Sequence, residues 1–173
     1  MPFAYYARLS PARQRIYRES DAIQSLELPP AVATGAHVAS IRASLAAARL
    51  ADVQKACQAL IDALVAGYGV QKIRVRVLAQ RPADEEGELH GLYEPDDAPK
   101  PAHITLWMRT AARKDVVAFK TFLRTLIHEL CHHLDYELYN MSETFHTEGF
   151  YKRESTLTNA LLRAESTAAG LPG

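Results

Sequence analysis

The stretch that decides the fold is FKTFLRTLIHELCHHLDYELYN, residues 119–140. Its apolar residues return every three or four positions, which is the spacing of a helix that is buried over much of its surface. The pattern predicts one helix from about Asp115 to Asn140, where asparagine is a common C-terminal stop. The apolar positions that carry this pattern are Val116, Phe119, Leu123, Leu126, Ile127, Leu130 and Leu134.

Within this helix, residues 128–132 read HELCH, an HExxH motif. Residues four apart on a helix differ by about 40° around the axis and about 6 Å along it, so two such imidazoles can bind one ion. His128 and His132 are therefore predicted ligands of Zn²⁺. Glu129 lies about 100° further round the helix, where it can act on a metal-bound water as general base without being a ligand.

A catalytic zinc site needs a third protein ligand and an open fourth position for water. His146 is the predicted third ligand, because neutral imidazole is the commonest side-chain metal ligand. The six residues after Asn140 can span about 20 Å, which exceeds the roughly 10–12 Å that the helix covers beyond His132. Three glutamates remain as alternatives for this ligand: Glu143, Glu148 and Glu154.

Other side chains near the motif are assigned different roles. His133 points about 100° away from His132 and is expected to be a supporting or surface imidazole. Cys131 is expected to pack in the core as a buried thiol. Asp135, one turn beyond His132, either orients an imidazole, binds backbone or is a solvated acid. Tyr151 is a candidate catalytic residue that donates to the developing oxyanion, with core packing as its alternative role.

The first part of the chain, residues 1–36, is predicted to be an N-terminal helical extension and linker. Ser10 can cap free backbone N–H groups and Pro11 suits the first helical position, so a helix over about 11–25 is expected. LELPP, residues 26–30, then interrupts helical structure, because proline lacks an N–H and restricts the residue before it.

The remaining part, residues 37–173, is predicted to be the main domain. An Ala-, Leu- and Arg-rich stretch predicts one long helix over about 37–66, ended by Gly67 or Gly69. QKIRVRVLA, residues 71–79, alternates apolar and basic residues as a half-buried strand does. HITLWM, residues 103–108, is rich in β-branched and aromatic residues and predicts another strand. A last helix is expected over about 150–164.

Residues 81–101 contain four prolines, two glycines and an acidic excess. They are predicted to form a loop with a short strand around Leu89–Tyr93, either as a solvated hairpin loop or as a cover over the cleft. Trp107 and its neighbours in HITLWM are read mainly as core residues. If HITLWM is an exposed edge strand beside the metal, an extended peptide can add to it by backbone hydrogen bonds.

HELCHHLD (residues 128–135), a short loop and HTEGF (residues 146–150) together resemble the SprT-like and related small zinc metallopeptidases. That group has HExxH followed by a histidine with an aromatic residue four positions later, and HITLWM is similar to its edge strand. The resemblance implies a minimal zincin core over about residues 37–165, with zinc ligands His128, His132 and His146 and catalytic base Glu129. One position departs from the group: Thr147 stands where glycine usually follows the third histidine.

The composition of the 173-residue chain excludes several classes of partner. Lys plus Arg and Asp plus Glu number 20 each, so no net charge attracts nucleic acid, and no zinc ribbon or basic segment is evident. Two distant cysteines argue against a disulfide framework and for a reducing compartment. Neither a secretion signal nor a stretch of about 20 apolar residues is seen, which predicts a cytoplasmic protein without a membrane partner.

These observations predict an α+β, zincin-like fold in which a small twisted sheet packs on the HExxH helix. The predicted function is zinc-dependent hydrolysis of peptide bonds in a peptide or protein substrate. One alternative is a non-catalytic, zinc-stabilised protein-interaction module, which would need a fourth protein ligand such as Cys131 or His133. Another alternative keeps the zinc chemistry and changes the substrate to a non-peptide amide or ester.

Overall fold

The computed structural model describes residues 2–30, 32–82, 90–97, 100–111 and 114–170. This part of the chain combines helices with one small sheet, which confirms the predicted α+β class. A short 3-10 turn, η1 (Tyr6–Arg8), precedes the first helix. The helices are α1 (Pro11–Ala22), α2 (Gly35–Ala46), α3 (Leu50–Tyr68), α4 (Phe119–Glu137) and α5 (Glu148–Ala168), and the strands are β1 (Arg74–Gln80), β2 (Gly91–Glu94) and β3 (His103–Arg109).

The sheet has the order β1-β3-β2, with β1 parallel and β2 antiparallel to β3. The HITLWM strand, β3, is therefore central, so it is not the edge strand that the resemblance implied and a peptide cannot add to it as a new strand. Residues 104–108 of β3 are all buried, as expected for the central strand of the sheet. The edge beside α4 belongs to β2, which includes most of the short strand predicted around residues 89–93; Leu89 itself lies outside the described residues.

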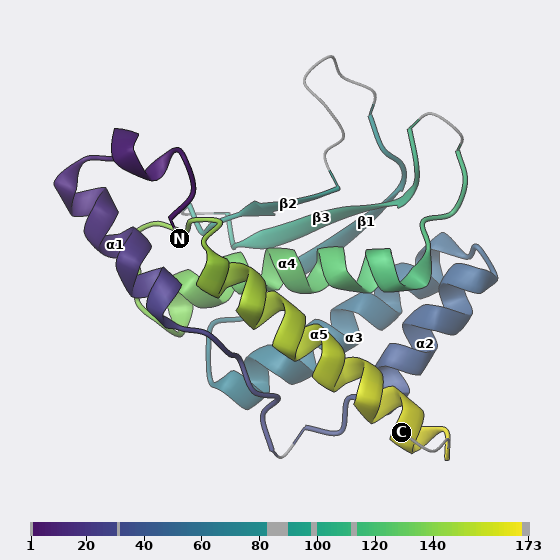
Figure 1. Cartoon of the computed structure of the whole chain (residues 1–173). Coiled ribbons are helices and arrows are strands. Elements are labelled where there is room, and N and C mark those ends of the chain that lie inside the picture. Colours follow the sequence, from purple (N-terminus) through teal and green to yellow (C-terminus); the bar gives the residue numbers. More distant parts are fainter. Residues whose placement is uncertain (1, 31, 83–89, 98–99, 112–113, 171–173) are drawn as a thin grey trace.

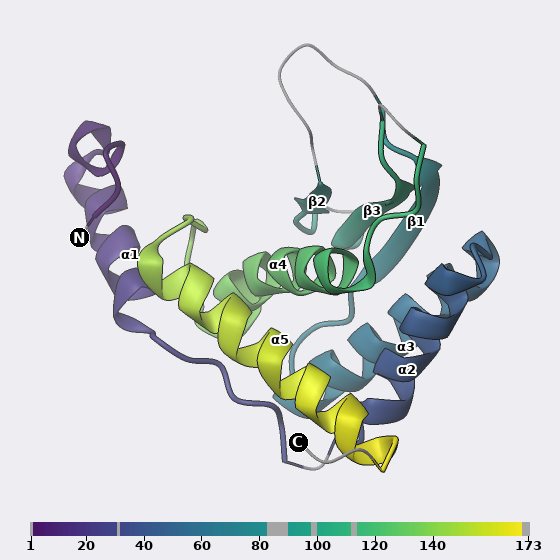
Figure 2. The ribbon, with the colours of Figure 1, turned by 45° about the vertical axis from the view of Figure 1, so that its right-hand side comes forward.

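Helix α4 lies between the sheet and the other helices. Figures 1 and 2 show the strands on one side of α4, and α2, α3 and α5 on the other. Buried residues lie on most sides of the helix, so it packs against the sheet and against the other helices. The helix begins at Phe119 and ends at Glu137, which is shorter than predicted. Val116 forms an isolated β-bridge with Arg109, and this extended pairing excludes the residues before Phe119 from the helix.

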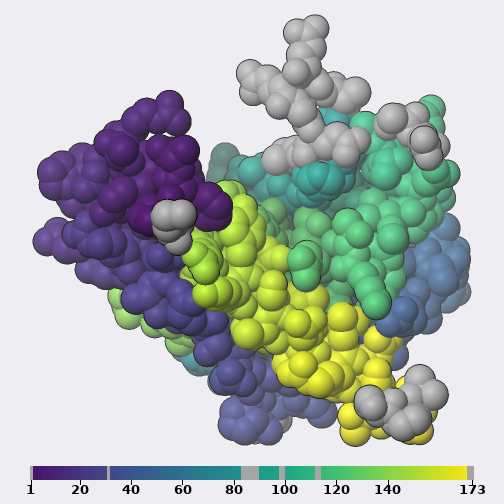
Figure 3. All heavy atoms as spheres, viewed as in Figure 1, coloured from purple at the N-terminus to yellow at the C-terminus, as the bar shows by residue number. Residues whose placement is uncertain are grey.

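Helix α1 packs against the first half of α5, so the N-terminal segment and the start of α5 share one face of the molecule (Figure 3). Ser10 caps α1 by accepting a hydrogen bond from the backbone N–H of Arg13 at 3.4 Å, as predicted. Thr147 caps α5 in the same way, accepting from the backbone N–H of Phe150 at 2.9 Å. No helix in the described ranges is long and apolar enough to cross a bilayer.

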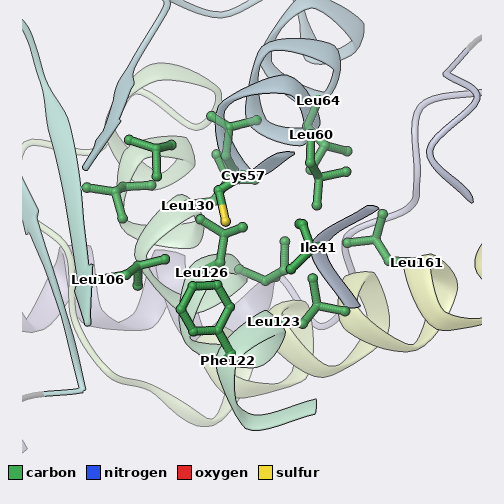
Figure 4. Close-up of a cluster of buried hydrophobic side chains, with 14 of the residues drawn as sticks. Ile41, Cys57, Leu60, Leu64, Leu106, Phe122, Leu123, Leu126, Leu130 and Leu161 are labelled. Atoms are coloured by element: carbon green, nitrogen blue, oxygen red, sulfur yellow. The ribbon is translucent and has the colours of Figure 1, made fainter. Parts of the chain in front are cut away.

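The single helix predicted over residues 37–66 is instead a hairpin of α2 and α3. The chain reverses through residues 47–49, where Ala48 has a left-handed φ of 52°. In one straight helix Ile41 and Leu64 would lie about 34 Å apart. In the hairpin both residues join the same buried cluster as Leu126 of α4 (Figure 4). Gly69, at φ 68°, ends α3 as one of the two predicted glycines.

The outer edge of β1 is hydrogen-bonded by two glutamine side chains of α3. Gln54 donates to the carbonyl of Val75 at 2.5 Å and accepts from the N–H of Val77 at 2.6 Å. Gln58 donates to the carbonyl of Ile73 at 3.1 Å and accepts from the N–H of Val75 at 2.8 Å. Side chains one helical turn apart thus take the place of a neighbouring strand.

Candidate metal centre

Three imidazoles converge where α4 meets the segment that joins α4 to α5, residues 138–147, called here the connecting segment. The helical spacing of α4 turns His128 and His132 to the same side, and the connecting segment returns His146 to meet them. Nε2 of His146 lies 3.0 Å from Nε2 of His128 and 3.1 Å from Nε2 of His132. Ligands on a tetrahedral zinc ion at about 2.0–2.1 Å are separated by about 3.3 Å, so the spacing fits such an ion.

The other ring nitrogen of each α4 histidine is held by an acceptor. Nδ1 of His128 donates to the Glu154 carboxylate at 2.8 Å. Nδ1 of His132 donates to the Thr144 hydroxyl at 2.8 Å, and that hydroxyl donates in turn to Asp135 at 2.8 Å. Both histidines therefore carry their proton on Nδ1 and present an unprotonated Nε2 to the centre.

These tautomers make the centre suitable for a cation. A neutral His146 carries at most one proton on Nε2 and can donate it to only one of the two facing nitrogens. The other contact would bring two nitrogen lone pairs within hydrogen-bond distance, which is unfavourable unless a positive ion lies between them. Burial, followed by the neighbouring His128 and His146, lowers the pKa of His132 to about 3, so its lone pair is free at neutral pH. Burial also lowers the pKa of His146.

The ring of Phe150 forms the floor beneath the three imidazoles. Its centroid lies 4.7 Å from the ring of His132, 5.0 Å from that of His128 and 5.2 Å from that of His146. Phe150 is fully buried in the first turn of α5. The aromatic residue four positions after the third histidine therefore packs against all three candidate ligands.

Glu129 lies beside the imidazoles, with only 6% of its surface exposed. Its carboxyl accepts a hydrogen bond from the backbone N–H of Tyr93 in β2. Burial raises the pKa of Glu129 to about 7, against the opposing effects of His128 and of the Tyr93 N–H. Gly91 makes room for this carboxyl, because a Cβ there would lie 2.5 Å from Oε1 and 2.8 Å from Cγ of Glu129.

None of the three glutamates considered as alternatives joins the group of metal-ligating atoms found among the described residues. Glu143 forms a bidentate ion pair with Arg13, and Glu148 pairs with Lys152 at 2.8 Å. Glu154 lies behind His128, on its Nδ1 side. The histidines 128, 132 and 146 form the group, with their ligating atoms within 4.8 Å of one another.

Cys131 and His133 face away from the group. Cys131 is a free, buried thiol in the hydrophobic core, as predicted. His133 is also buried, and its Nε2 and Nδ1 contact the carbonyl of Gln71 at 2.8 Å and the hydroxyl of Tyr93 at 3.3 Å. Because both ring nitrogens have partners, His133 supports the packing of β2 on α4.

The structure decides between the alternative roles that were predicted for Asp135, and it excludes core packing for Tyr151. Asp135 is fully buried, so the prediction of a solvated acid is wrong, and it orients His132 through Thr144. Tyr151 is 41% exposed and its ring stacks on that of His146 at 5.8 Å, so it is not a core residue. Trp107 is buried within β3, as the core interpretation predicted.

A groove of about 720 Å³ contains the centre and runs along α4. One wall is β2 and the residues next to it; the other is formed by the connecting segment and α5. Several lining side chains were not predicted to take part in the site or were assigned another role, among them Thr121, Arg124, Tyr136, Thr144 and Glu154. Helical spacing alone finds the α4 members of this set, since Arg124 and Tyr136 lie four positions from a histidine of the motif and Thr121 lies seven positions, about two turns, before His128. Thr144 has no such signal.

Comparison of the chain with known protein families, curated proteins and solved structures gives no match. The resemblance to SprT-like metallopeptidases therefore stays a prediction from the motif. Any assignment of function has to be argued from the geometry of the site.

Proposed function

We propose that this protein is a zinc metallopeptidase of the zincin type. One observation carries the proposal: three imidazole Nε2 atoms and a buried carboxyl, from Glu129, meet in one groove. Two of the imidazoles have their tautomers fixed by Glu154 and Thr144, so they can bind a divalent ion without rearrangement.

The chemistry assigns a proton-transfer role to Glu129. Zn²⁺ bound by His128, His132 and His146 would supply a Lewis acid that lowers the pKa of water and polarises a carbonyl. Glu129 takes a proton from the attacking water and returns it to the leaving amine. A carboxyl whose pKa burial raises to about 7 is well matched to both steps near neutral pH.

The hydroxyl of Tyr151, a residue that is 41% exposed, is the proposed donor to the oxyanion. Its ring stacks on that of His146, and the residue lines the groove, so its side chain borders the same space as the candidate ligands. A donor that meets the developing negative charge lowers the barrier more than one that binds the ground state.

A peptide substrate fits the shape of the groove. The groove follows α4 from Thr121 to Tyr136, about 22 Å at the helical rise, which accommodates six or seven extended residues. Strand β2 forms one wall, and no other strand in the described ranges pairs with its outer edge. Main-chain hydrogen bonds to this edge would bind extended peptides with limited preference for sequence.

A purely structural metal site is less consistent with these surroundings. Structural zinc is usually closed by four protein ligands. Within the described part of the chain only three ligating side chains cluster, and the two residues considered for a fourth, Cys131 and His133, are used elsewhere. A site with three protein ligands in an open groove favours catalysis.

The test begins with metal analysis of the purified protein, for which we expect one zinc per chain, and proteolysis of an unfolded protein substrate. Glu129→Gln should keep the metal and lose proteolysis by at least about a hundredfold, because the general base is gone. Glu137→Gln makes the same change two turns further along α4 and should leave activity unchanged. Full activity of Glu129→Gln, or wild-type protein that binds no metal, would refute the proposal.

A further inference from the structure

We propose that residues 2–23, called here the N-terminal clamp, position the third ligand, His146, and so determine how tightly the centre binds metal. The inference rests on the proposed metal site. It assigns a positioning role to Tyr5 and Arg13, which lie outside the HExxH motif and outside the zincin core predicted from the sequence.

The connecting segment has little regular structure of its own to hold His146. One backbone hydrogen bond lies within it, from the N–H of Thr147 to the carbonyl of Phe145, and the N–H of Met141 donates back to the carbonyl of Asp135 in α4. A ligand in such a segment would lose backbone freedom on binding metal, and this loss of conformational entropy would weaken binding. Preorganisation by other parts of the protein removes that cost from metal binding.

The N-terminal clamp supplies these contacts. The Tyr5 hydroxyl donates to the backbone carbonyl of His146 at 2.9 Å. Arg13 binds both carboxylate oxygens of Glu143, at 2.8 and 2.5 Å, and its guanidinium lies 5.3 Å from the centre of the Phe145 ring. The clamp therefore reaches the third ligand itself and two residues within three positions before it.

The same segment also reaches the start of α5. Asp21 accepts a hydrogen bond from the backbone N–H of Gly149 at 3.0 Å. A Cβ at Gly149 would lie 2.5 Å from the carbonyl oxygen of Asp21 and 2.7 Å from that of Ser20. These are backbone atoms that cannot rotate away, so glycine is required for α1 to approach this closely.

A buried arginine connects the clamp to the second ligand. Arg153, only 1% exposed, donates to the carbonyls of Ser20 and Ile23 at 2.6 and 2.9 Å. It also donates to Asp135 at 2.7 Å. Asp135 accepts a second hydrogen bond from the Thr144 hydroxyl, and that hydroxyl accepts one from His132. Hydrogen bonds thus link the end of α1 to His132, while Tyr5 links the chain before α1 to His146.

The test uses the full chain and two kinds of variant. Tyr5→Phe combined with Arg13→Ala removes the exposed contacts to the connecting segment. Gly149→Ala forces α1 away from α5 while improving the helix propensity at that position. Arg49→Ala breaks a comparable exposed ion pair with Asp52, and Gly35→Ala places a Cβ against the far end of α5, so these two variants serve as matched controls.

Two measurements report on the clamp. In Co²⁺-loaded protein, both clamp variants should bind the metal about tenfold more weakly and change the visible absorption bands, whereas the controls keep the wild-type affinity and spectrum. In metal-free protein, the amides of residues 141–147 should lose protection from hydrogen exchange in the clamp variants only. Unchanged affinity, spectrum and exchange in both clamp variants would overturn the inference.

The two measurements also separate this inference from the proposed function. If the wild-type protein binds no metal, the proposed function fails, and the exchange experiment still decides whether the clamp orders the connecting segment. If Gly149→Ala does not fold, the Tyr5→Phe, Arg13→Ala variant decides, because both of its substitutions remove hydrogen-bonding groups without introducing a clash.

Discussion

The two outer strands of the sheet have edges with opposite properties. The free edge of β1 is occupied by the side-chain amides of Gln54 and Gln58, which pair with its backbone as another strand would. The free edge of β2 faces the groove, and its one hydrogen bond to the site runs from the Tyr93 N–H to Glu129. The protein therefore seals the edge that lies far from the centre and leaves open the one beside it.

This difference indicates how a small sheet can offer one edge to an extended ligand without inviting uncontrolled pairing. An unprotected edge strand is a template for association with other chains. Glutamines one turn apart on a helix satisfy both donors and acceptors of an edge, which a charged residue does not. The open edge is short, only four residues, and it is bordered by a helix, which limits what can pair with it.

The largest expected effect comes from breaking the open edge where it meets Glu129, the proposed general base. Gly91→Ala places a Cβ against Glu129, and displacement of a catalytic group by about 1 Å can cost a hundredfold in rate. We expect turnover to fall by about that factor while the zinc content stays at the wild-type level. Gly67→Ala, which places a Cβ against Val32 and Pro29 outside the groove, is the control. Normal turnover by Gly91→Ala would show that the carboxyl can move without loss.

Opening the sealed edge should have the next largest effect. Gln54→Leu combined with Gln58→Leu leaves four backbone groups of β1 without their partners, and we expect the free energy of unfolding to drop by about 2 kcal/mol. Urea denaturation measures this change. Sedimentation should also reveal self-association through the exposed edge, whereas Lys55→Leu, between the two glutamines, should remain monodisperse to the same degree as the wild type. An unaltered midpoint would mean that the glutamines contribute nothing to stability.

The smallest of the three effects is expected from a substitution that leaves both edges intact. It removes only a hydrogen bond that orients one candidate ligand. Thr144→Val keeps the shape of the side chain and removes the hydroxyl that connects Asp135 to His132. We expect metal affinity to fall about tenfold, as measured by competition with a chelator. Thr121→Val removes a hydroxyl from the same groove without touching a histidine and should bind metal normally. Equal affinities for the two variants would exclude Thr144 from a role in metal binding.

Much of the centre could be predicted because its chemistry is local. The spacing of His128 and His132 determines their direction on any helix, and chain length alone allows His146 to return to them. The hydrogen bonds that orient the imidazoles could not be predicted in the same way. Thr144 and Glu154 acquire their roles only when the connecting segment and α5 fold back on α4, which no short-range pattern encodes.

The errors in the fold have similar causes. The break at Ala48 contains neither glycine nor proline, so helix propensity favours continuation and only core packing explains the turn. The apolar run of HITLWM favours a core strand, but the sequence left open whether this strand lies at an edge or at the centre of the sheet. Strand order depends on pairing between distant segments, and the residues of one strand do not determine which neighbours it will have.

The strand order also has a consequence for the time course of folding. The central strand β3 follows both outer strands in the chain, so during synthesis β1 and β2 emerge before the partner they share. Strand β1 can already dock on α3, whose glutamines precede it and match its backbone. Strand β2 has no such early partner, and the third histidine emerges later still. We therefore expect the α3–β1 half to form as an early unit, and the groove with its candidate metal ligands to be assembled last.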